Sequence, residues 1–198
     1  MKVLALGNIP SRLTPIRKAT GCHVMEYSGK IDVGFLKNQL INFIVSYRYR
    51  HIIKKEVLRY LTKKIINLHI SLLSWNRGSD PNLWSFLEDT PKGISIHNIN
   101  NEGIDTGDII AQKEFFFDEE VETLASTYKK LNDEIIELFK IKWPLIKEGD
   151  FPSSKQPKGG SSHMSSDKKK FEYLLAKSNY HSPVKELKGK ALKSKNEF

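Results

Sequence analysis

The chain has 198 residues, enough for one ordinary domain with an appendage, and its 39% hydrophobic content is typical of a globular protein. No apolar run approaches the roughly 18 residues that cross a bilayer, so we expect no membrane partner, and the single cysteine favours a reducing, cytoplasmic location. The single cysteine, Cys22, excludes an internal disulfide and a zinc site built from clustered cysteines.

The net charge of +9 is distributed unevenly along the chain. Residues 155–198 hold eleven Lys against four acids, and residues 47–65 hold seven basic residues against one Glu. Residues 66–150 hold eight basic and sixteen acidic residues. The two basic segments suit an anionic partner such as RNA, and they equally suit a solvated tail and a solvated helix face.

The first half of the sequence alternates between strand and helix patterns. Strands are predicted at 2–6, 23–27, 42–47 and 65–70, and helices at 32–40 and 54–65. Because strands that alternate with helices form parallel sheets, we expect an α/β domain.

The second half continues with a short helix, two strands, a long helix and a tail. The helices are predicted at 82–87, 123–143, 171–176 and 184–192, the strands at 93–99 and 109–117, and an extended linker at 149–166. The two strands should pair across the loop that holds Asp105. We expect a catalytic domain over 1–148 and a basic C-terminal extension over 149–198.

The chemistry-bearing residues are Asn67, His69 and Asp105. Asn67 and His69 alternate on one predicted strand, so both side chains should point to the same face. Asp105 brings a carboxylate in a Gly-flanked loop. An amide, an imidazole and a carboxylate are the groups needed to transfer an acyl group. A satisfied core pair at Asn67 and His69, or a metal site that includes His97, are the alternatives.

Several spaced motifs strengthen the catalytic interpretation. They are Asn67-x-His69, Ser71-Leu72-Leu73, Arg77-Gly78 and Asp105-Thr106-Gly107. Over about 42–114 this combination resembles the folate-dependent formyltransferase family. Trp75–Gly78, Pro81–Trp84 and Gln156–His163 are most similar to the sugar N-formyltransferases in that family. One departure is Ser74, which stands where relatives carry Pro.

The resemblance implies a Rossmann-like fold, with a mainly parallel sheet flanked by helices and a C-terminal extension. Its N-terminal half should be shortened, since only 66 residues precede Asn67. The implied reaction moves a formyl group from 10-formyltetrahydrofolate to the amine of an amino sugar, itself carried on a nucleotide, for cell-surface glycans such as lipopolysaccharide. No metal is implied, and a homodimer is an expected form. The alternatives are glycinamide ribonucleotide or methionyl-tRNA as acceptor, or an inactive basic nucleotide- or RNA-binding relative.

The resemblance also implies a role for each site residue. Asn67 and His69 would donate to the oxyanion, and Asp105 would orient His69 and favour its charged form. The expected folate contacts come from Tyr49, Arg50, His51, Ile52 and Asp105, and the expected acceptor contacts from Trp75, Arg77 and His97.

Overall fold

The computed structural model describes residues 1–8, 13–100, 103–175 and 180–195. Its strands are β1 (Lys2–Leu6), β2 (His23–Tyr27), β3 (Phe43–Tyr47), β4 (Ile65–His69), β5 (Arg77–Gly78), β6 (Lys92–Asn98), β7 (Ile109–Phe115) and β8 (Ser162–His163). Its helices are α1 (Thr14–Thr20), α2 (Val33–Asn38), α3 (Lys55–Tyr60), α4 (Pro81–Leu87), α5 (Leu124–Glu148), the 3₁₀ helix η2 (Asp167–Phe171), α6 (Glu172–Leu175), α7 (Val184–Leu187) and α8 (Lys190–Lys195).

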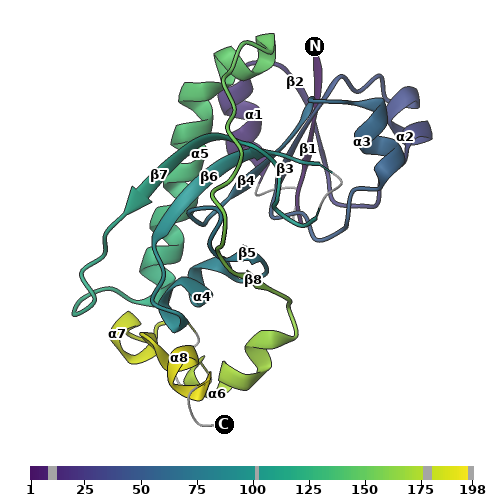
Figure 1. Cartoon of the computed structure of the whole chain (residues 1–198). Coiled ribbons are helices and arrows are strands. Elements are labelled where there is room, and N and C mark those ends of the chain that lie inside the picture. Colours follow the sequence, from purple (N-terminus) through teal and green to yellow (C-terminus); the bar gives the residue numbers. More distant parts are fainter. Residues whose placement is uncertain (9–12, 101–102, 176–179, 196–198) are drawn as a thin grey trace. The chain divides into compact units, whose positions relative to one another are not determined.

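A six-stranded sheet in the order β2-β1-β3-β4-β6-β7 organises the chain (Figure 1). The β1–β2, β1–β3 and β3–β4 pairs are parallel, and β6 neighbours β7 as predicted. The predicted α/β class with a mainly parallel sheet is therefore confirmed. In the described part of the chain, no helix is both long and apolar enough to cross a membrane.

The chain divides into two compact units. The first contains Met1–His69, Ile96–Ala111 and Ile135–Lys155, and the second contains Ile70–Ser95, Gln112–Glu134 and Gln156–Phe198. The division into a 1–148 domain and a 149–198 extension stays a prediction.

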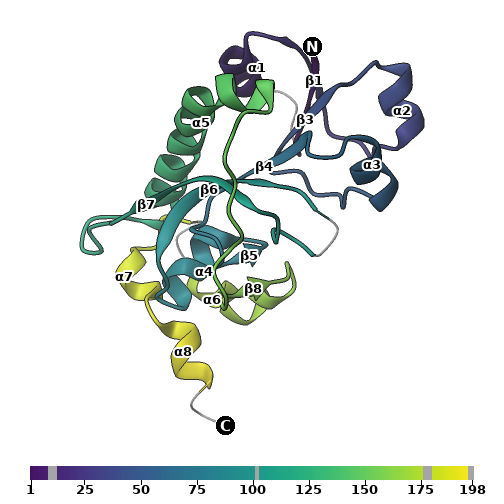
Figure 2. The same ribbon diagram turned by 45° about the horizontal axis from the view of Figure 1, so that its top comes forward.

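Helices cover both faces of the sheet in the first unit. The views in Figures 1 and 2 agree that α2 and α3 lie on one side of β1 and β3, with α1 and the C-terminal half of α5 on the other. Leu4, Ile44 and Ile65 point to the α2–α3 side, where they pack in a buried cluster with Leu36 and Val57. β1, β3 and β4 contain near-continuous apolar runs at 3–6, 43–45 and 65–66, so these strands are buried on both faces.

On the opposite face, Trp143 of α5 anchors the helix. Its indole nitrogen donates to the Thr20 carbonyl oxygen over 2.9 Å, and its ring packs edge-on against Phe43 at 5.2 Å. The predicted helix 123–143 is real but longer, because α5 continues to Glu148 through Pro144.

The helical segments that differ most from the predictions are the following. The sequence pattern missed α1, which has Pro near its start and no side-chain cap. The helix predicted at 54–65 ends at Tyr60, because Lys63 adopts φ 58° and Ile65 already opens β4. The helix predicted at 184–192 is broken at Gly189 (φ 67°) into α7 and α8. In the helix predicted at 171–176, Ala176 lies outside the described residues, and the observed pieces are η2 and α6.

Candidate active site

Asn67 and His69 converge with Asp105 in the first unit. Asn67 pairs in register with Ser46 of β3 and shares its face of β4 with His69, as the period of a strand requires. Asn67 Nδ2 donates to Asp105 Oδ1 over 3.0 Å, and His69 Nδ1 lies 3.7 Å from Asp105 Oδ2. The two carboxylate oxygens therefore face an amide on one side and an imidazole on the other.

The loop that carries Asp105 is fixed by its own residues. Asp105 has φ 53°, a left-handed conformation that Asp adopts more readily than most residues. Thr106 Oγ1 lies within hydrogen-bond distance of Asn100 Oδ1 (3.0 Å) and of the Gly103 carbonyl oxygen (3.1 Å). A Cβ on Gly107 would lie 1.7 Å from the Asn98 carbonyl oxygen, so only glycine fits there. The loop thus holds the carboxylate in one place.

His97 of β6 also belongs to this cluster, because its ring lies beside both Asn67 and Asp105. Its Nδ1 lies 2.8 Å from the Asn98 carbonyl oxygen, which only accepts, so this nitrogen carries the proton. Its Nε2 is then placed to accept from Asn67 Nδ2 at 3.2 Å, and it lies 3.4 Å from Asp105 Oδ1. Both hydrogens of the Asn67 amide are therefore engaged, one by His97 and one by Asp105.

His97 is only 1% exposed, and its contacts in this structure include the side chains of Asn67 and Asp105, the backbone, and the His69 ring, which it meets edge-on at 6.2 Å. Its expected contact with the acceptor stays a prediction. His69 and the Asp105 side chain keep slightly more exposure, 7% and 12%. Across the described ranges, no group of three or more His, Cys, Asp or Glu side chains, the His69–His97–Asp105 cluster included, is arranged to hold a metal ion.

The loop after β3, expected to contact the folate, also lies in the first unit. The Tyr49 hydroxyl donates to the Gly29 carbonyl oxygen over 2.7 Å, and its ring meets the His51 ring edge-on at 5.3 Å. Arg50 and Ile52 are exposed, Ile52 by 80%. Tyr49 therefore ties the loop down, while its neighbours face solvent.

The Tyr49 phenol should lose its proton at a higher pH than an ordinary tyrosine. Burial, with a smaller contribution from nearby Tyr27, raises the pKa of Tyr49 from 10.0 to about 12. A raised pKa means that folding favours the protonated phenol, so its contribution to stability is complete below pH 10 and is lost as the pH rises toward 12. We expect the phenolate absorbance of the wild type to contain one component near pH 12 that Tyr49→Phe removes. If the component lost in that variant titrated near pH 10, the buried environment assigned to Tyr49 would be wrong.

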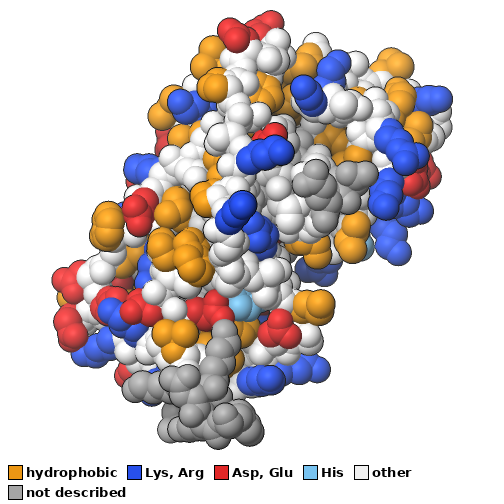
Figure 3. Space-filling view, viewed as in Figure 1, with side chains coloured by type: hydrophobic (Ala, Val, Ile, Leu, Met, Phe, Trp, Pro, Cys, Tyr) orange, Lys and Arg blue, Asp and Glu red, His pale blue; other side chains and the backbone are white. Residues whose placement is uncertain are grey.

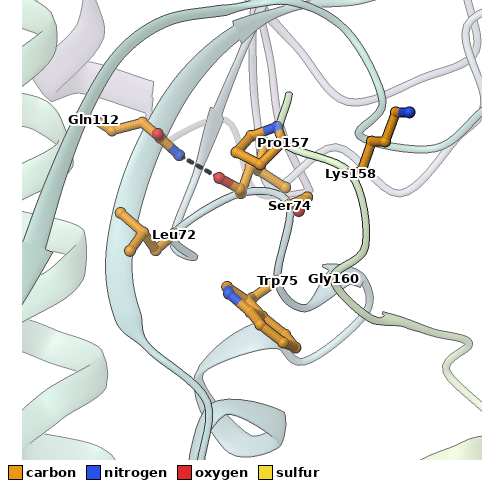
Figure 4. Close-up of a pocket in the computed structure, with 8 residues that line it drawn as sticks. Leu72, Ser74, Trp75, Gln112, Pro157, Lys158 and Gly160 are labelled. Atoms are coloured by element: carbon orange, nitrogen blue, oxygen red, sulfur yellow. Dashed lines mark hydrogen bonds between the residues drawn. The ribbon is translucent and has the colours of Figure 1, made fainter. Parts of the chain in front are cut away.

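The second unit holds a separate cavity of about 390 Å³ beside Trp75. That volume is within the range of small-molecule sites. In Figure 4, Leu72, Pro157 and the Trp75 indole surround the hollow, and a hydrogen bond crosses its edge. Gln112 Nε2 donates there to the Leu73 carbonyl oxygen over 2.8 Å. Trp75 is 37% exposed, which leaves part of its ring open to a ligand.

One wall of this cavity comes from Gln156–His163, which we call the strap. Ser161 fixes it to the Ser74–Arg77 loop, because the Asn76 backbone nitrogen donates to Ser161 Oγ (3.0 Å) and the Arg77 nitrogen to the Ser161 carbonyl oxygen (2.9 Å). A Cβ on Gly160, which has φ +89°, would lie 2.0 Å from the Ser74 carbonyl oxygen. The strap therefore lies in close contact with the loop.

Two side chains strengthen the strap. Arg77 Nε and Nη2 both donate to Gln156 Oε1, over 2.9 and 2.8 Å. His163 stacks on Trp84 with ring centres 3.8 Å apart, and its Nε2 lies 3.2 Å from Glu88 Oε2. The predicted linker over 149–166 is thus wrong for this part, where β8 pairs with β5. The acceptor contacts expected of Trp75 and Arg77 stay predictions.

Comparison with known proteins gives a family match. The model of a family described as formyl transferase matches residues 17–139. This is wider than the motif-bearing 42–114 stretch.

Three relatives illustrate the similarity. One is the formyltransferase PseJ from Anoxybacillus kamchatkensis, whose crystal structure is in complex with UDP-4,6-dideoxy-4-formamido-L-AltNAc and tetrahydrofolate. Its sequence is 44% identical to this chain, and its structure matches with a TM-score of 0.88 over 96% of this chain and 100% of that one. A sugar N-formyltransferase from Shewanella sp. has the same fold at 21% identity, with a TM-score of 0.73 over 86% of this chain and 79% of that one. A methionyl-tRNA formyltransferase from Fusobacterium nucleatum is 36% identical over 124 residues, which are 62% of this chain but only 39% of that protein.

Proposed function

Because the chain belongs to the folate-dependent formyltransferase family, we propose that it moves a formyl group from 10-formyltetrahydrofolate to the amine of a nucleotide-linked amino sugar. The observation that supports the sugar acceptor most is the likeness to PseJ, whose structure contains a UDP-linked formamido sugar and tetrahydrofolate. The likeness extends over the whole of that chain. The product would be a building block for cell-surface glycans such as lipopolysaccharide.

The reaction forms one carbon–nitrogen bond and breaks another. The neutral sugar amine attacks the formyl carbon and gives a tetrahedral intermediate with a negative oxygen. The bond to N10 of the folate then breaks, the attacking nitrogen loses a proton, and N10 gains one. The site must therefore stabilise an oxyanion and move a proton between two nitrogens.

We assign these tasks to three residues. His69 donates to the oxyanion and mediates the proton transfer, since an imidazole changes charge near neutral pH. Asp105, 3.7 Å from the His69 ring, stabilises the imidazolium form through its charge. Asn67 donates to the oxyanion after exchanging one of its two present partners, His97 or Asp105. Loss of one such donor commonly raises the barrier by about 2.7–4 kcal/mol.

The folate is assigned to the first unit. The Tyr49–Ile52 loop, tied to Gly29 through the Tyr49 hydroxyl, offers backbone groups and an exposed edge to the pterin. Loops at the carboxyl ends of parallel strands are the usual ligand sites of α/β sheets. Tyr49 lies directly after β3, next to the strand that carries Asn67.

The acceptor is assigned to the Trp75 cavity. A partly exposed indole beside Leu72 and Pro157 offers a flat apolar surface to a base or sugar ring. Arg77, which grips the strap through Gln156, then shapes the cavity wall, and any contact it makes with an acceptor phosphate adds to that role.

Trp75→Ala should weaken acceptor binding far more than catalysis. Loss of a stacked ring commonly costs about 1–3 kcal/mol, so the KM for the sugar should rise roughly tenfold to hundredfold, with kcat and the KM for the folate changed by less than about threefold. Tyr173→Ala, an exposed aromatic of the same unit outside the cavity, is the control. Unchanged KM for every sugar in the Trp75 variant would remove the cavity from the acceptor site.

The decisive experiment is incubation with 10-formyltetrahydrofolate and a panel of nucleotide-linked amino sugars, with mass spectrometry of the products. One acceptor should gain a formyl group and release tetrahydrofolate in equal amount. If every sugar is returned unchanged by folded protein, the proposed reaction is wrong.

A second candidate acceptor is methionyl-tRNA, favoured by the match to the Fusobacterium nucleatum enzyme. The chain spans about two fifths of that enzyme's length. Glycinamide ribonucleotide is a further acceptor of the same chemistry. Presenting the three acceptors together and measuring which one is formylated first separates them. We expect the sugar to be used fastest, since the likeness to PseJ covers the whole of that chain, whereas the match to the methionyl-tRNA enzyme covers only 39% of it.

We further propose that the reaction takes place in the cytoplasm. We also propose that the enzyme acts as a homodimer. Sedimentation at two protein concentrations tests the dimer.

A further inference from the structure

The loop that carries Trp75 is held together by hydrogen bonds of its own. We call residues 71–75 the Trp75 loop. The Ser71 hydroxyl donates to the Trp75 carbonyl oxygen over 2.9 Å, and the Trp75 backbone nitrogen donates to the Leu72 carbonyl oxygen over 3.0 Å. Because both ends of the Trp75 peptide are tied to its own loop, the position of the indole depends on where the whole loop lies.

The Ser95 hydroxyl joins this loop to β6. Ser95 is fully buried, and its oxygen contacts Ser71, Leu73 and Gln112. The Ser71 carbonyl oxygen, 2.6 Å away, only accepts, so the single hydroxyl proton of Ser95 is donated there. The Leu73 backbone nitrogen donates to Ser95 Oγ over 3.1 Å. Gln112 must therefore donate to Ser95 as well.

Gln112 of β7 uses both hydrogens of its amide on this arrangement. Its Nε2 donates to Ser95 Oγ and to the Leu73 carbonyl oxygen, each over 2.8 Å. An amide turned the other way would place Oε1 against two atoms that offer it no hydrogen, so the orientation of the side chain is defined. A carboxylate of the same size has no hydrogen to donate and cannot take its place.

Gln112 and the Trp75 loop both line the cavity of the second unit. Figure 4 shows Gln112 and Trp75 at the border of the hollow, with the hydrogen bond to the Leu73 carbonyl as a dashed line. Figure 3 shows apolar side chains exposed beside the strap. Trp75 is 37% exposed, whereas Ser71 and Leu73 of the same loop are buried. An exposed indole on a firmly bonded loop loses little further freedom when a ring stacks on it, which favours binding.

We propose that Gln112 is a positioning residue for the acceptor, because its amide holds the Trp75 loop, and with it the indole, in the form that receives a base or sugar ring. The part of this inference that concerns the acceptor rests on the proposed function. The strap holds the other side of the loop, since the Asn76 backbone nitrogen donates to Ser161 Oγ over 3.0 Å. Gln112 therefore anchors one side of Trp75 and the strap anchors the other.

Tryptophan fluorescence tests the loop without any ligand. The chain has three tryptophans, and Trp84 and Trp143 are only 5% and 2% exposed, so the neutral quencher acrylamide reaches mainly Trp75. Gln112→Met removes both donated hydrogen bonds with a side chain of similar length and no charge. It should raise the bimolecular quenching constant from time-resolved decays, because a released indole is more accessible. Adding Trp75→Phe should remove that increase.

Steady-state kinetics test whether this position serves the acceptor. Gln112→Met and Gln112→Glu should each raise the KM for the sugar about tenfold, with kcat and the KM for the folate within about threefold of wild type. Gln39→Met and Gln39→Glu make the same two changes in the first unit and should leave all three constants unchanged. Calorimetry with UDP, the nucleotide named in the PseJ complex, gives the same comparison without turnover.

The outcomes separate this proposal from the proposed function. If the wild type formylates a sugar and the Gln112 variants use that sugar and bind UDP equally well, Gln112 has no positioning role and the proposed function stands. If the wild type formylates no sugar, the proposed function fails, while the quenching result still decides whether Gln112 holds the loop. An unchanged quenching constant in Gln112→Met would show that the loop does not depend on this amide.

Two further results would also overturn the proposal. If only Gln112→Glu raises the KM for the sugar, the introduced charge and not the lost donors is responsible. If kcat falls while that KM stays the same, Gln112 acts on the reaction and not on acceptor binding. Thermal unfolding accompanies each variant. Gln112→Asn, whose shorter amide cannot reach both partners, replaces Gln112→Met if the latter does not fold.

Discussion

Replacing Asp105 with Asn is expected to lower kcat about a thousandfold while the protein stays folded. The substitution keeps an oxygen for the Asn67 amide, which now donates to Asp105 Oδ1 over 3.0 Å. It removes the negative charge 3.7 Å from His69, so an imidazolium is no longer stabilised during the transfer. General acid–base catalysis by a positioned side chain commonly contributes 10²–10⁴-fold, roughly the loss expected here.

The measurement is steady-state kinetics with 10-formyltetrahydrofolate and the best sugar acceptor, alongside thermal unfolding. Asp108→Asn is the matched control, since it makes the same change in the same loop, and it should retain activity within about threefold. A fully active Asp105→Asn enzyme would exclude this carboxylate from the chemistry. Equal losses in both variants would point to the loop's fold instead.

Gly107→Ala is expected to damage both stability and catalysis. A Cβ at this position would lie 1.7 Å from the Asn98 carbonyl oxygen, and this neighbour is backbone that cannot rotate away. The loop must therefore shift, at a cost of about 2–4 kcal/mol, comparable to other severe backbone substitutions. Because Asp105 is carried by the same loop, it moves with it. A displacement of about 1 Å at a catalytic group can cost about a hundredfold in rate.

Gly103→Ala provides the comparison. The nearest atom to a Cβ at that position is Thr106 Cγ2 at 3.1 Å, a side-chain methyl that can move. We expect Gly103→Ala to change the free energy of unfolding by less than about 1 kcal/mol and to remain active. Chemical denaturation gives the free energy of unfolding of both variants, and steady-state kinetics gives their activity. Wild-type stability in Gly107→Ala would mean that the loop is less constrained than the structure indicates.

The convergence of Asn67, His69 and Asp105 could be foreseen because the sequence signals that predict it are local. Asn67 and His69 share a strand face through the two-residue period, and the Gly-flanked Asp105 follows a strand that neighbours theirs. The family predicted from these motifs is confirmed by the match over residues 17–139. The hydrogen bonds of His97 could not be foreseen, because they depend on where β6 lies beside β4 and on which tautomer the Asn98 carbonyl selects.

The strap is the clearest case of information that sequence patterns lack. Gly, Pro and Ser at 149–166 predict an extended linker, and the conformation of Gly160 is indeed one that glycine favours. However, β8 is only two residues long and its partner β5 lies more than eighty positions earlier. Neither strand has a periodicity of its own, so only their pairing in three dimensions defines them.

The predicted end of the 54–65 helix was wrong for a related reason. The apolar spacing at 54–65 continues past Tyr60 because Leu61 and Ile65 are both buried, one at the end of α3 and one in β4. Burial gives the same apolar signal in either state. In contrast, α1 was missed because its short apolar face, with Ile16 buried, lacks capping residues that would mark its start.

The strap and the cluster of Asn67, His69 and Asp105 belong to different compact units, and under the proposed function this separation bears on how such an enzyme diversifies. Pro157 and Lys158 line the cavity and make none of the hydrogen bonds to Asn67, His69 or Asp105 given above, whereas Gly160 is confined by the nearby Ser74 carbonyl oxygen. Under the proposed function, a lineage could therefore exchange one sugar for another by changing a few positions late in the chain, while the formyl-transfer centre assigned to the first unit stays as it was. Under the same proposal, swapping residues 156–163 between relatives is expected to move acceptor preference from one enzyme to the next.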